Sequence, residues 1–141
     1  MDRKDPYTNF RFRVEIDGIE QAGFSECTGL GASIEVLQYR EGGEPATVHK
    51  LPGKVNYPDI KLKWGITDSR DLYDWLNDAV KGKILRKNGS VILRDSLGDE
   101  RVRWNFYEAW PSAWAGPDFN ATKTEVAIET LTLVCERIER G

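Results

Sequence analysis

The sequence predicts a mainly β fold, a small antiparallel β-barrel or sandwich of about eight strands with one α-helix at about residues 69–81. Apolar and charged residues alternate strictly over Phe10–Ile16 and again over Asp59–Trp64, as half-buried strands require. One segment has helical spacing instead, with apolar residues at Leu72, Trp75, Leu76 and Ala79. Thr67 or Asp68 is its expected N-cap, and Gly82 its expected stop.

The remaining strands are expected in short segments that are bounded by turn residues. They cover Gln21–Cys27, Ser33–Tyr39, Thr47–Leu51, Gly89–Arg94, Val102–Trp110 and Glu125–Arg137. Gly29 and Gly31 bracket a break between two of these strands, and the Gly-rich stretch Arg40–Ala46 is predicted to be an exposed hairpin tip or a long loop. Pro52-Gly53 and Trp110-Pro111 are interpreted as strand ends.

The last expected strand changes phase along its length. Val126 and Ile128 share one face, whereas Leu131, Leu133 and Cys135 occupy the other. A bulge near Glu129 and Thr130 would bring the two sets onto one face. The sequence therefore predicts a bulge there.

Length and charge exclude several classes of protein. The 141 residues fit a single domain over residues 1–141, and no linker or repeat divides them. The 23 acidic and 20 basic residues nearly cancel, which argues against direct nucleic-acid binding through clustered Lys and Arg. The N-terminal residues form no apolar run, so we expect no signal peptide and a cytoplasmic location during assembly.

The search for catalytic, metal-binding or cofactor-binding chemistry gives no candidate residues. His49 is the single histidine and has no ligand-type neighbours at metal-site spacing. Cys27 and Cys135 lie far apart in sequence, and we expect two reduced thiols, with a disulfide as the alternative. Four carboxylates follow the predicted helix and are expected on its solvent side: Asp68, Asp71, Asp74 and Asp78.

An aromatic run leaves a second interpretation open. Packing in the core or between subunits is the first reading, but flat rings in series also form carbohydrate-stacking platforms. A monomeric ligand-binding β-barrel is therefore an alternative. The run consists of Trp104, Phe106, Tyr107, Trp110 and Trp114.

Strand edges suggest how a protein without a catalytic site could act. Unpaired edges of identical subunits can join head to tail, and a closed ring of this kind merges the sheets into one larger barrel. Strand faces towards the pore should then be polar. Glu35 with Ser33, and Lys61 with Lys63, fit that demand, although a sheet that faces solvent fits it as well.

Motifs along nearly the whole chain resemble the phage tail tube family of contractile phages and extracellular contractile injection systems. They include Asp5-Pro6-Tyr7, Asn9-Phe10, Phe12–Gly18, Ala22–Glu26, Gly29-Leu30, Tyr39–Gly43, Lys50–Gly53, Thr67–Ser69, Trp104–Phe106, Ala109–Pro111 and Glu125–Glu129. The resemblance implies a structural subunit without cofactors that closes into six-fold rings, which stack into a hollow tube. It also implies a location in a phage-tail-like particle, either released or membrane-anchored.

The same resemblance implies partners and contact residues. The expected partners are other copies of the chain in hexameric rings, a sheath protein, baseplate or tube-initiator proteins, a tube cap or terminator, and a luminal cargo or tape-measure protein. A tube-initiating paralogue at the baseplate is the alternative within the family. The residues implied at ring-to-ring contacts are Asp5, Pro6, Tyr7, Asn9, Arg40, Glu41, Gly42, Gly43, Leu51, Pro52 and Gly53.

Overall fold

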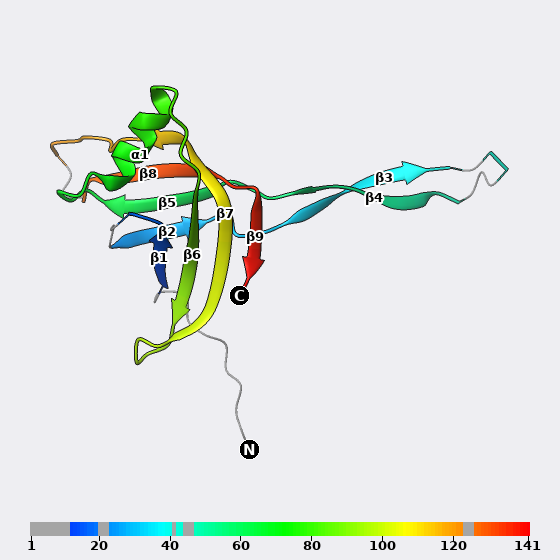
Figure 1. The fold of residues 1–141 in the computed structure, drawn as a ribbon, viewed down its shortest axis with the longest axis horizontal. Helices are drawn as coiled ribbons and strands as arrows, with labels where there is room; N and C mark the ends of the chain where they lie inside the picture. The colour runs from blue at the N-terminus through cyan, green and yellow to red at the C-terminus, as the bar shows by residue number, and fades with distance from the viewer. Residues whose placement is uncertain (1–11, 20–22, 41, 44–46, 123–125) are drawn as a thin grey trace, which may run out of the picture.

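The computed structural model describes residues 12–19, 23–40, 42–43, 47–122 and 126–141. Within them it contains nine strands and one helix, which confirms the mainly β class (Figure 1). The elements are β1 (Phe12–Ile16), β2 (Phe24–Thr28), β3 (Ser33–Tyr39), β4 (His49–Asn56), β5 (Ile60–Gly65), α1 (Asp71–Val80), β6 (Lys87–Arg94), β7 (Glu100–Ala115), β8 (Ile128–Val134) and β9 (Arg137–Arg140).

The body consists of two antiparallel sheets that share β7. One sheet contains β1, β6, the first part of β7, and β9; the other contains the last part of β7, β8, β5 and β2. β7 passes between them at a bulge, where Glu108 has a φ of 55° and its N–H donates to Asn88 Oδ1 at 3.0 Å. The strand end expected at Trp110-Pro111 is wrong, because Pro111 lies opposite Leu133 and β7 continues to Ala115. Proline has no N–H to donate, but it is tolerated here because the other edge of β7 has no partner among the described strands.

The core lies between the two sheets and under the helix. Alternation in β5 buries Ile60, Leu62 and Trp64 as expected, and they are at most 3 % exposed. Leu131 and Leu133 of β8 and Phe106 of β7 complete this core at 0 % exposure. The Phe106 ring packs directly against Gly89. An added Cβ at Gly89 would lie 2.3 Å from this ring, so a residue with a side chain does not fit there.

Helix α1 covers one end of the body against β7 (Figure 1). Its apolar stripe is as predicted, with Leu72, Trp75 and Leu76 buried, and the Trp75 indole N–H donates to Leu85 O at 2.7 Å. The N-cap prediction is wrong, because Arg70 occupies that position without a side-chain capping bond. Gly82 stops the helix at a φ of 91°. No helix in the described ranges is long and apolar enough to cross a membrane.

The bulge predicted near Glu129 and Thr130 is absent. β8 pairs with β5 in unbroken register from Ile128 to Leu133, so its two apolar sets lie on opposite faces of one regular strand. The odd-numbered set is buried, whereas Ile128 is 42 % exposed on the other face. The expected single strand to Arg137 is also interrupted after Val134, and β9 continues along the same edge of β7.

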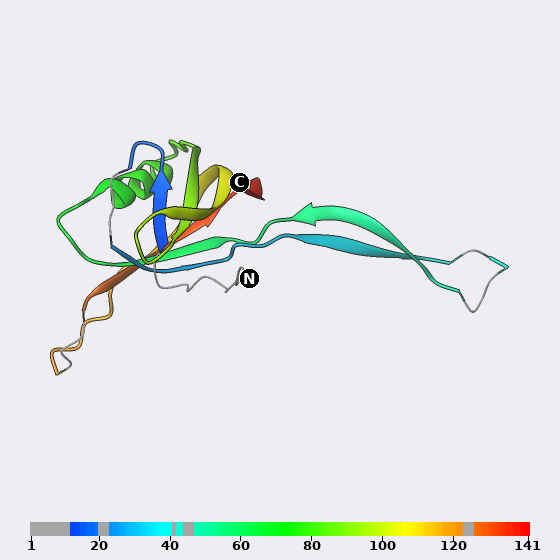
Figure 2. The same cartoon turned by 90° about the horizontal axis from the view of Figure 1, so that it is seen from below.

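β3 and β4 form a separate two-stranded sheet, which we call the arm. It projects far beyond the body in both views (Figures 1 and 2). The predicted end of β4 at Pro52-Gly53 is wrong, because the strand runs on to Asn56. A register shift opposite Glu35 accommodates Gly53, and proline is tolerated next to a bulge in an edge strand.

The arm leaves the body at Gly29, between β2 and β3. Gly29 has a φ of 98°, and a Cβ on it would lie 1.9 Å from the carbonyl oxygen of Asp59. No L-residue with a side chain fits there without a backbone shift. The break expected around Gly29 and Gly31 is therefore a close backbone crossing at the root of the arm.

Candidate assembly interface

The arm exposes large apolar side chains that its own chain does not cover. Val36 is 61 % exposed and Ile34 57 %, and neighbours in both strands are about half exposed. A two-stranded hairpin is only marginally stable in water by itself. An apolar ribbon of this length indicates a surface that is covered in an assembly.

Both faces of the arm are apolar. The pairs Leu37–Leu51 and Tyr39–His49 share one face, and the Tyr39 and His49 rings lie 6.4 Å apart. Ile34–Val55 and Val36–Pro52 share the opposite face. Two separate surfaces are needed to cover the arm, because no single flat surface reaches both faces.

The contact residues predicted from the sequence fall into two groups. Asp5, Pro6, Tyr7, Asn9 and Glu41 lie outside the described residues. All the others are in the arm: Arg40, Gly42 and Gly43 near its tip, and Leu51, Pro52 and Gly53 along β4.

Sequence reasoning missed the apolar side chains of β3. These are Ile34, Val36 and Leu37, joined across the pair by Val55. A signal was present, because the segment Ser33–Tyr39 carries apolar residues at both even and odd positions. In a strand that is covered by its own body on one face only, apolar residues occupy a single phase.

The second sheet of the body has two edges without a partner among the described strands. Of these strands, β2 pairs with β5 alone, so the backbone groups of its other edge have no partner in the described part of the chain. Beyond Ala109 the edge of β7 that had paired with β6 has no partner among the described strands, while β8 occupies the opposite edge. Such edges are templates for another chain.

Two rows of the outer face of this sheet carry only polar or small side chains, whereas Ile128 on the same face is apolar. Across the sheet, Thr28, Lys61, Thr132 and Ala113 form one row, and Glu26, Lys63, Thr130 and Ala115 form the next. Lys63 Nζ lies 3.5 Å from Glu26 Oε2. This face matches the composition expected of a pore lining, and two of its residues are the predicted pair Lys61 and Lys63.

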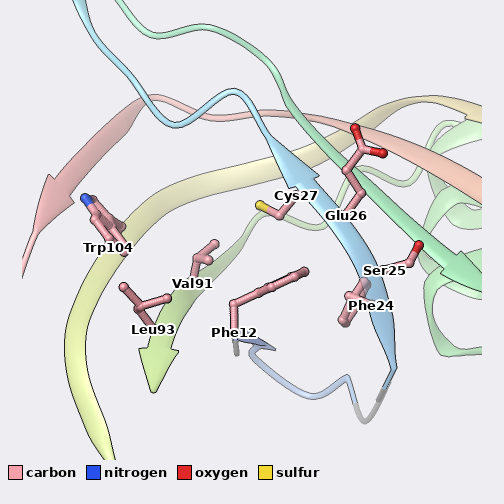
Figure 3. Close-up of a pocket in the computed structure, with 8 residues that line it drawn as sticks. All are labelled: Phe12, Phe24, Ser25, Glu26, Cys27, Val91, Leu93 and Trp104. Atoms are coloured by element: carbon pink, nitrogen blue, oxygen red, sulfur yellow. The ribbon is translucent and has the colours of Figure 1, made fainter. Parts of the chain in front are cut away.

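A groove opens between β2 and the strands of the first sheet (Figure 3). It encloses about 620 Å³, and apolar side chains dominate its walls: Phe12, Phe24, Cys27, Val91, Leu93 and Trp104. Ligand pockets usually combine such walls with convergent polar groups. Here the polar side chains are Ser25 and Glu26, and Figure 3 shows Glu26 directed away from Val91 and Leu93.

The thiols offer no activated nucleophile. Burial raises the pKa of Cys27 to about 11, and burial together with the nearby Asp59 carboxylate raises the pKa of Cys135. Both are free cysteines, as expected. A thiol is nucleophilic only as the thiolate, so both side chains act as small apolar groups at neutral pH.

The carboxylates near the helix are on the solvent side, as predicted. Asp68, Asp71 and Asp74 are exposed, Asp78 is half-buried, and Arg70 pairs with Asp74 at 3.6 Å. Within the described ranges, no three His, Cys, Asp or Glu residues gather into a possible metal site.

The described residues form a β-body with free strand edges and an uncovered arm. The family model for the T4-like virus tail tube protein gp19 matches residues 8–139. The chain belongs to this family. No curated protein sequence matches it.

Solved structures of tube-bearing particles are similar to the tail tube chain over most of its length. A chain in the anti-feeding prophage baseplate is 25 % identical, with a TM-score of 0.88 over 99 % of this chain and 97 % of that one. A chain in the PVC sheath-tube complex of an extracellular contractile injection system is 28 % identical, with a TM-score of 0.87 over 96 % and 91 %. The predicted function, a structural tube component of a contractile injection system or phage tail, is confirmed.

A more distant likeness supports the fold alone. Hcp1 from Flavobacterium johnsoniae is 19 % identical, with a TM-score of 0.59 over 94 % of this chain and 95 % of that one. The tail tube chain therefore shares its architecture with a protein that is distant in sequence.

The aromatic run of the tail tube chain does not form a single platform. Trp104 borders the groove, Phe106 is in the core, and Tyr107 stacks on the guanidinium of Arg137 at 4.1 Å. Trp114 instead meets the ring of Tyr73 edge-on at 5.6 Å. Packing, the first interpretation of this run, describes these contacts, and neither Trp110 nor Trp114 lines the groove.

Proposed function

We propose that this chain, as one tail-tube-like domain over residues 1–141, is the inner tube subunit of a phage-tail-like contractile particle. Six copies close into a ring, and the rings stack into a hollow tube inside a sheath. The observation that carries the proposal is the arm, which is apolar on both faces and projects away from its own body. In a stacked assembly, neighbouring copies would cover both faces of it.

The unpaired edges supply a way to close the ring. If β2 of one copy adds to the free edge of β7 in the next, the four-stranded sheets merge into one continuous barrel. A head-to-tail contact of this kind closes into a ring when the rotation from one copy to the next is a whole fraction of a full turn. The polar outer face with Lys61 and Lys63 would then line the lumen.

The partners follow from the same role. The similar chains come from structures described as a baseplate, a sheath-tube complex and a tube-terminating cap. We infer equivalent partners here: a sheath, baseplate or tube-initiator proteins, and a cap or terminator. A cargo or tape-measure protein would occupy the lumen. Assembly would take place in the cytoplasm before the particle is released or anchored.

A catalytic role is not part of this proposal. A tube subunit works through rigid contacts, and the thiols are held protonated by burial. A turnover assay gives a direct check. Activity that depends on His49 would contradict a purely structural role.

Negative-stain microscopy and mass photometry of the purified protein test the assembly. We expect rings of six copies of 16.1 kDa, about 97 kDa in total, and tubes at higher concentration. Strictly monomeric protein at high concentration, even with sheath and baseplate partners added, would contradict the proposal. Rings that never elongate would favour the tube-initiating paralogue instead, to which the baseplate relative also points.

The monomeric ligand-binding barrel has its own test. The residue to change is Trp104, because it borders the groove. A monomer that binds a carbohydrate, and loses this binding on Trp104→Ala, would favour that alternative over the tube subunit.

A further inference from the structure

The strands of the body leave one seam open. Their hydrogen-bonded path runs β1-β6-β7-β8-β5-β2, and its two end strands, β1 and β2, do not pair with each other in the described part of the chain. The groove of Figure 3 lies along this seam, because Phe12 of β1 and residues 24–27 of β2 line it from its two sides. Val91, Leu93 and Trp104 complete its walls. The seam is therefore a place where the apolar interior of one copy is open to solvent.

One row of core-facing residues crosses the second sheet from edge to edge. The row consists of Cys27 in β2, Leu62 in β5, Leu131 in β8 and Trp114 in β7. Its middle members, Leu62 and Leu131, are 0 % exposed, whereas Cys27 borders the groove and Trp114 is 39 % exposed. A core row that is buried in its middle and open at both ends indicates that the packing continues into another copy.

The side chain of Trp114 is held in place by its own chain. Its ring meets the ring of Tyr73 in α1 edge-on at 5.6 Å, and its indole N–H donates to Glu129 Oε2 at 3.3 Å. The Tyr73 ring in turn lies 5.7 Å from the guanidinium carbon of Arg70. Because the one polar group of Trp114 is bonded, its exposed part is apolar and pre-ordered. Aromatic side chains of this kind are frequent anchors at interfaces.

The two open ends of the row meet if the ring closes through sheet edges. When β2 of one copy pairs with the free edge of β7 in the next, the Trp114 end of one row faces the Cys27 end of the other on the same side of the barrel wall. All strands then remain antiparallel, because β2 and β8 run in the same direction and β8 is antiparallel to β7. The aromatic side chain of one copy is thereby brought to the apolar groove of its neighbour.

We propose that Trp114, positioned by Tyr73, inserts into the groove of the next copy in the same ring and completes the core of that copy. The groove encloses about 620 Å³, and Figure 3 shows Glu26 directed away from Val91 and Leu93, so an indole ring would meet apolar atoms. A second copy is the occupant because the groove borders the free edge of β2. The inference rests on the proposed function and adds the residues that join neighbouring copies within a ring.

Alkylation of Cys27 by iodoacetamide reports whether the groove is filled. Dilute subunits and assembled rings are treated at the same pH, and the modified peptides are quantified by mass spectrometry. We expect Cys27 to react at least about tenfold more slowly in rings, because thiol reactivity depends on access. Cys135, which is 9 % exposed in the core, is the internal control and should react equally in both samples. Equal rates for Cys27 would overturn the proposal, because the groove would then stay open in the ring or be filled already in the single subunit.

Trp114→Ala tests the anchor, with Leu97→Ala as the matched control. Leu97 is 83 % exposed between β6 and β7, so this change also removes an exposed apolar side chain. We expect Trp114→Ala to need an at least about tenfold higher concentration for half-assembly into rings, and Leu97→Ala to behave as wild type. In the rings that Trp114→Ala forms at high concentration, Cys27 should be alkylated as fast as in dilute subunits. Circular dichroism of the dilute variants checks their folding.

A double-mutant cycle with Leu93→Ala keeps the test valid if Trp114→Ala also weakens the subunit itself. Leu93 lines the groove of its own copy and Trp114 does not, so within one copy the two changes should act independently. If the two side chains meet across copies, the double variant should lose about tenfold in assembly, as each single variant does. Losses that multiply to about a hundredfold would overturn the contact.

The outcomes also separate this inference from the proposed function. Rings of Trp114→Ala that form at the wild-type concentration would overturn the anchor and leave the tube subunit standing. A wild-type protein that forms no rings would contradict the tube function itself. A wild-type monomer in which an added carbohydrate protects Cys27 would overturn the inference in favour of the ligand-binding barrel.

Discussion

At the scale of single residues, Gly29 carries the sharpest constraint on the arm. Gly29→Ala would combine a left-handed backbone with a Cβ 1.9 Å from Asp59 O. We expect the free energy of unfolding to fall by about 3 kcal/mol or more, from left-handed strain plus overpacking. Urea unfolding monitored by Trp fluorescence measures it.

Gly98 supplies the control for this prediction. Its φ is 86°, but no described atom would lie within 4 Å of an added Cβ. Gly98→Ala should cost only about 1 kcal/mol of backbone strain. Equal losses for the two variants would show that the close approach to Asp59 does not constrain the root of the arm.

Cys27 makes stability depend on pH in the alkaline range. Burial raises its pKa from 9.0 to about 11, so the folded chain keeps a proton that the unfolded chain releases above pH 9. This contribution is complete below pH 9, and it is lost as the pH rises to about 11. We expect Cys27→Ala to flatten the decline in the free energy of unfolding between pH 9 and 10.5. Parallel declines for variant and wild type in urea titrations would contradict it.

At the scale of elements, alternation in the sequence predicted the strands that bury one face, such as β5 and β1. The errors arose where a local sequence signal was interpreted without knowing which strands would lie beside it. Pro52 and Pro111 were interpreted as strand ends, yet both are compatible with strands that have a free edge or a bulge nearby. A bulge in β8 would bring Ile128 onto the same face as Leu131 and Leu133. The structure instead leaves Ile128 on the outward face of a regular strand.

The tip of the arm gives a prediction at this scale. In Gly42→Val with Gly43→Val, neither added Cβ would meet a described atom within 4 Å, so the subunit should fold normally. If the tip packs between stacked rings, the two bulky side chains should block stacking and shorten the tubes severalfold. Tube lengths in negative stain measure this, with circular dichroism as the folding control. Unchanged lengths would remove the tip from the contact.

At the scale of the whole molecule, the sequence predicted self-assembly more readily than the surfaces that perform it. Every described residue among the contacts that the family resemblance implies lies in the arm or its tip. The free edges of β2 and β7, by contrast, depend on which strands meet in space. No local pattern encodes that arrangement, so the structure was needed to find them.

Ring closure through sheet edges predicts a specific pattern of hydrogen exchange. Amide groups on the outer edge of β2, and those in residues 112–115 of β7 that point away from β8, have no partner among the described strands of one copy, and they would gain backbone partners in a closed ring. We expect peptides over these two segments to exchange at least tenfold more slowly in assembled tubes than in dilute subunits. Peptides over Val91 and Ile92, which β6 already buries between β1 and β7, are the internal control. Assembled tubes in which β2 exchanges as fast as in free subunits would show that the rings close through another surface, because a paired edge cannot exchange at the rate of an open one.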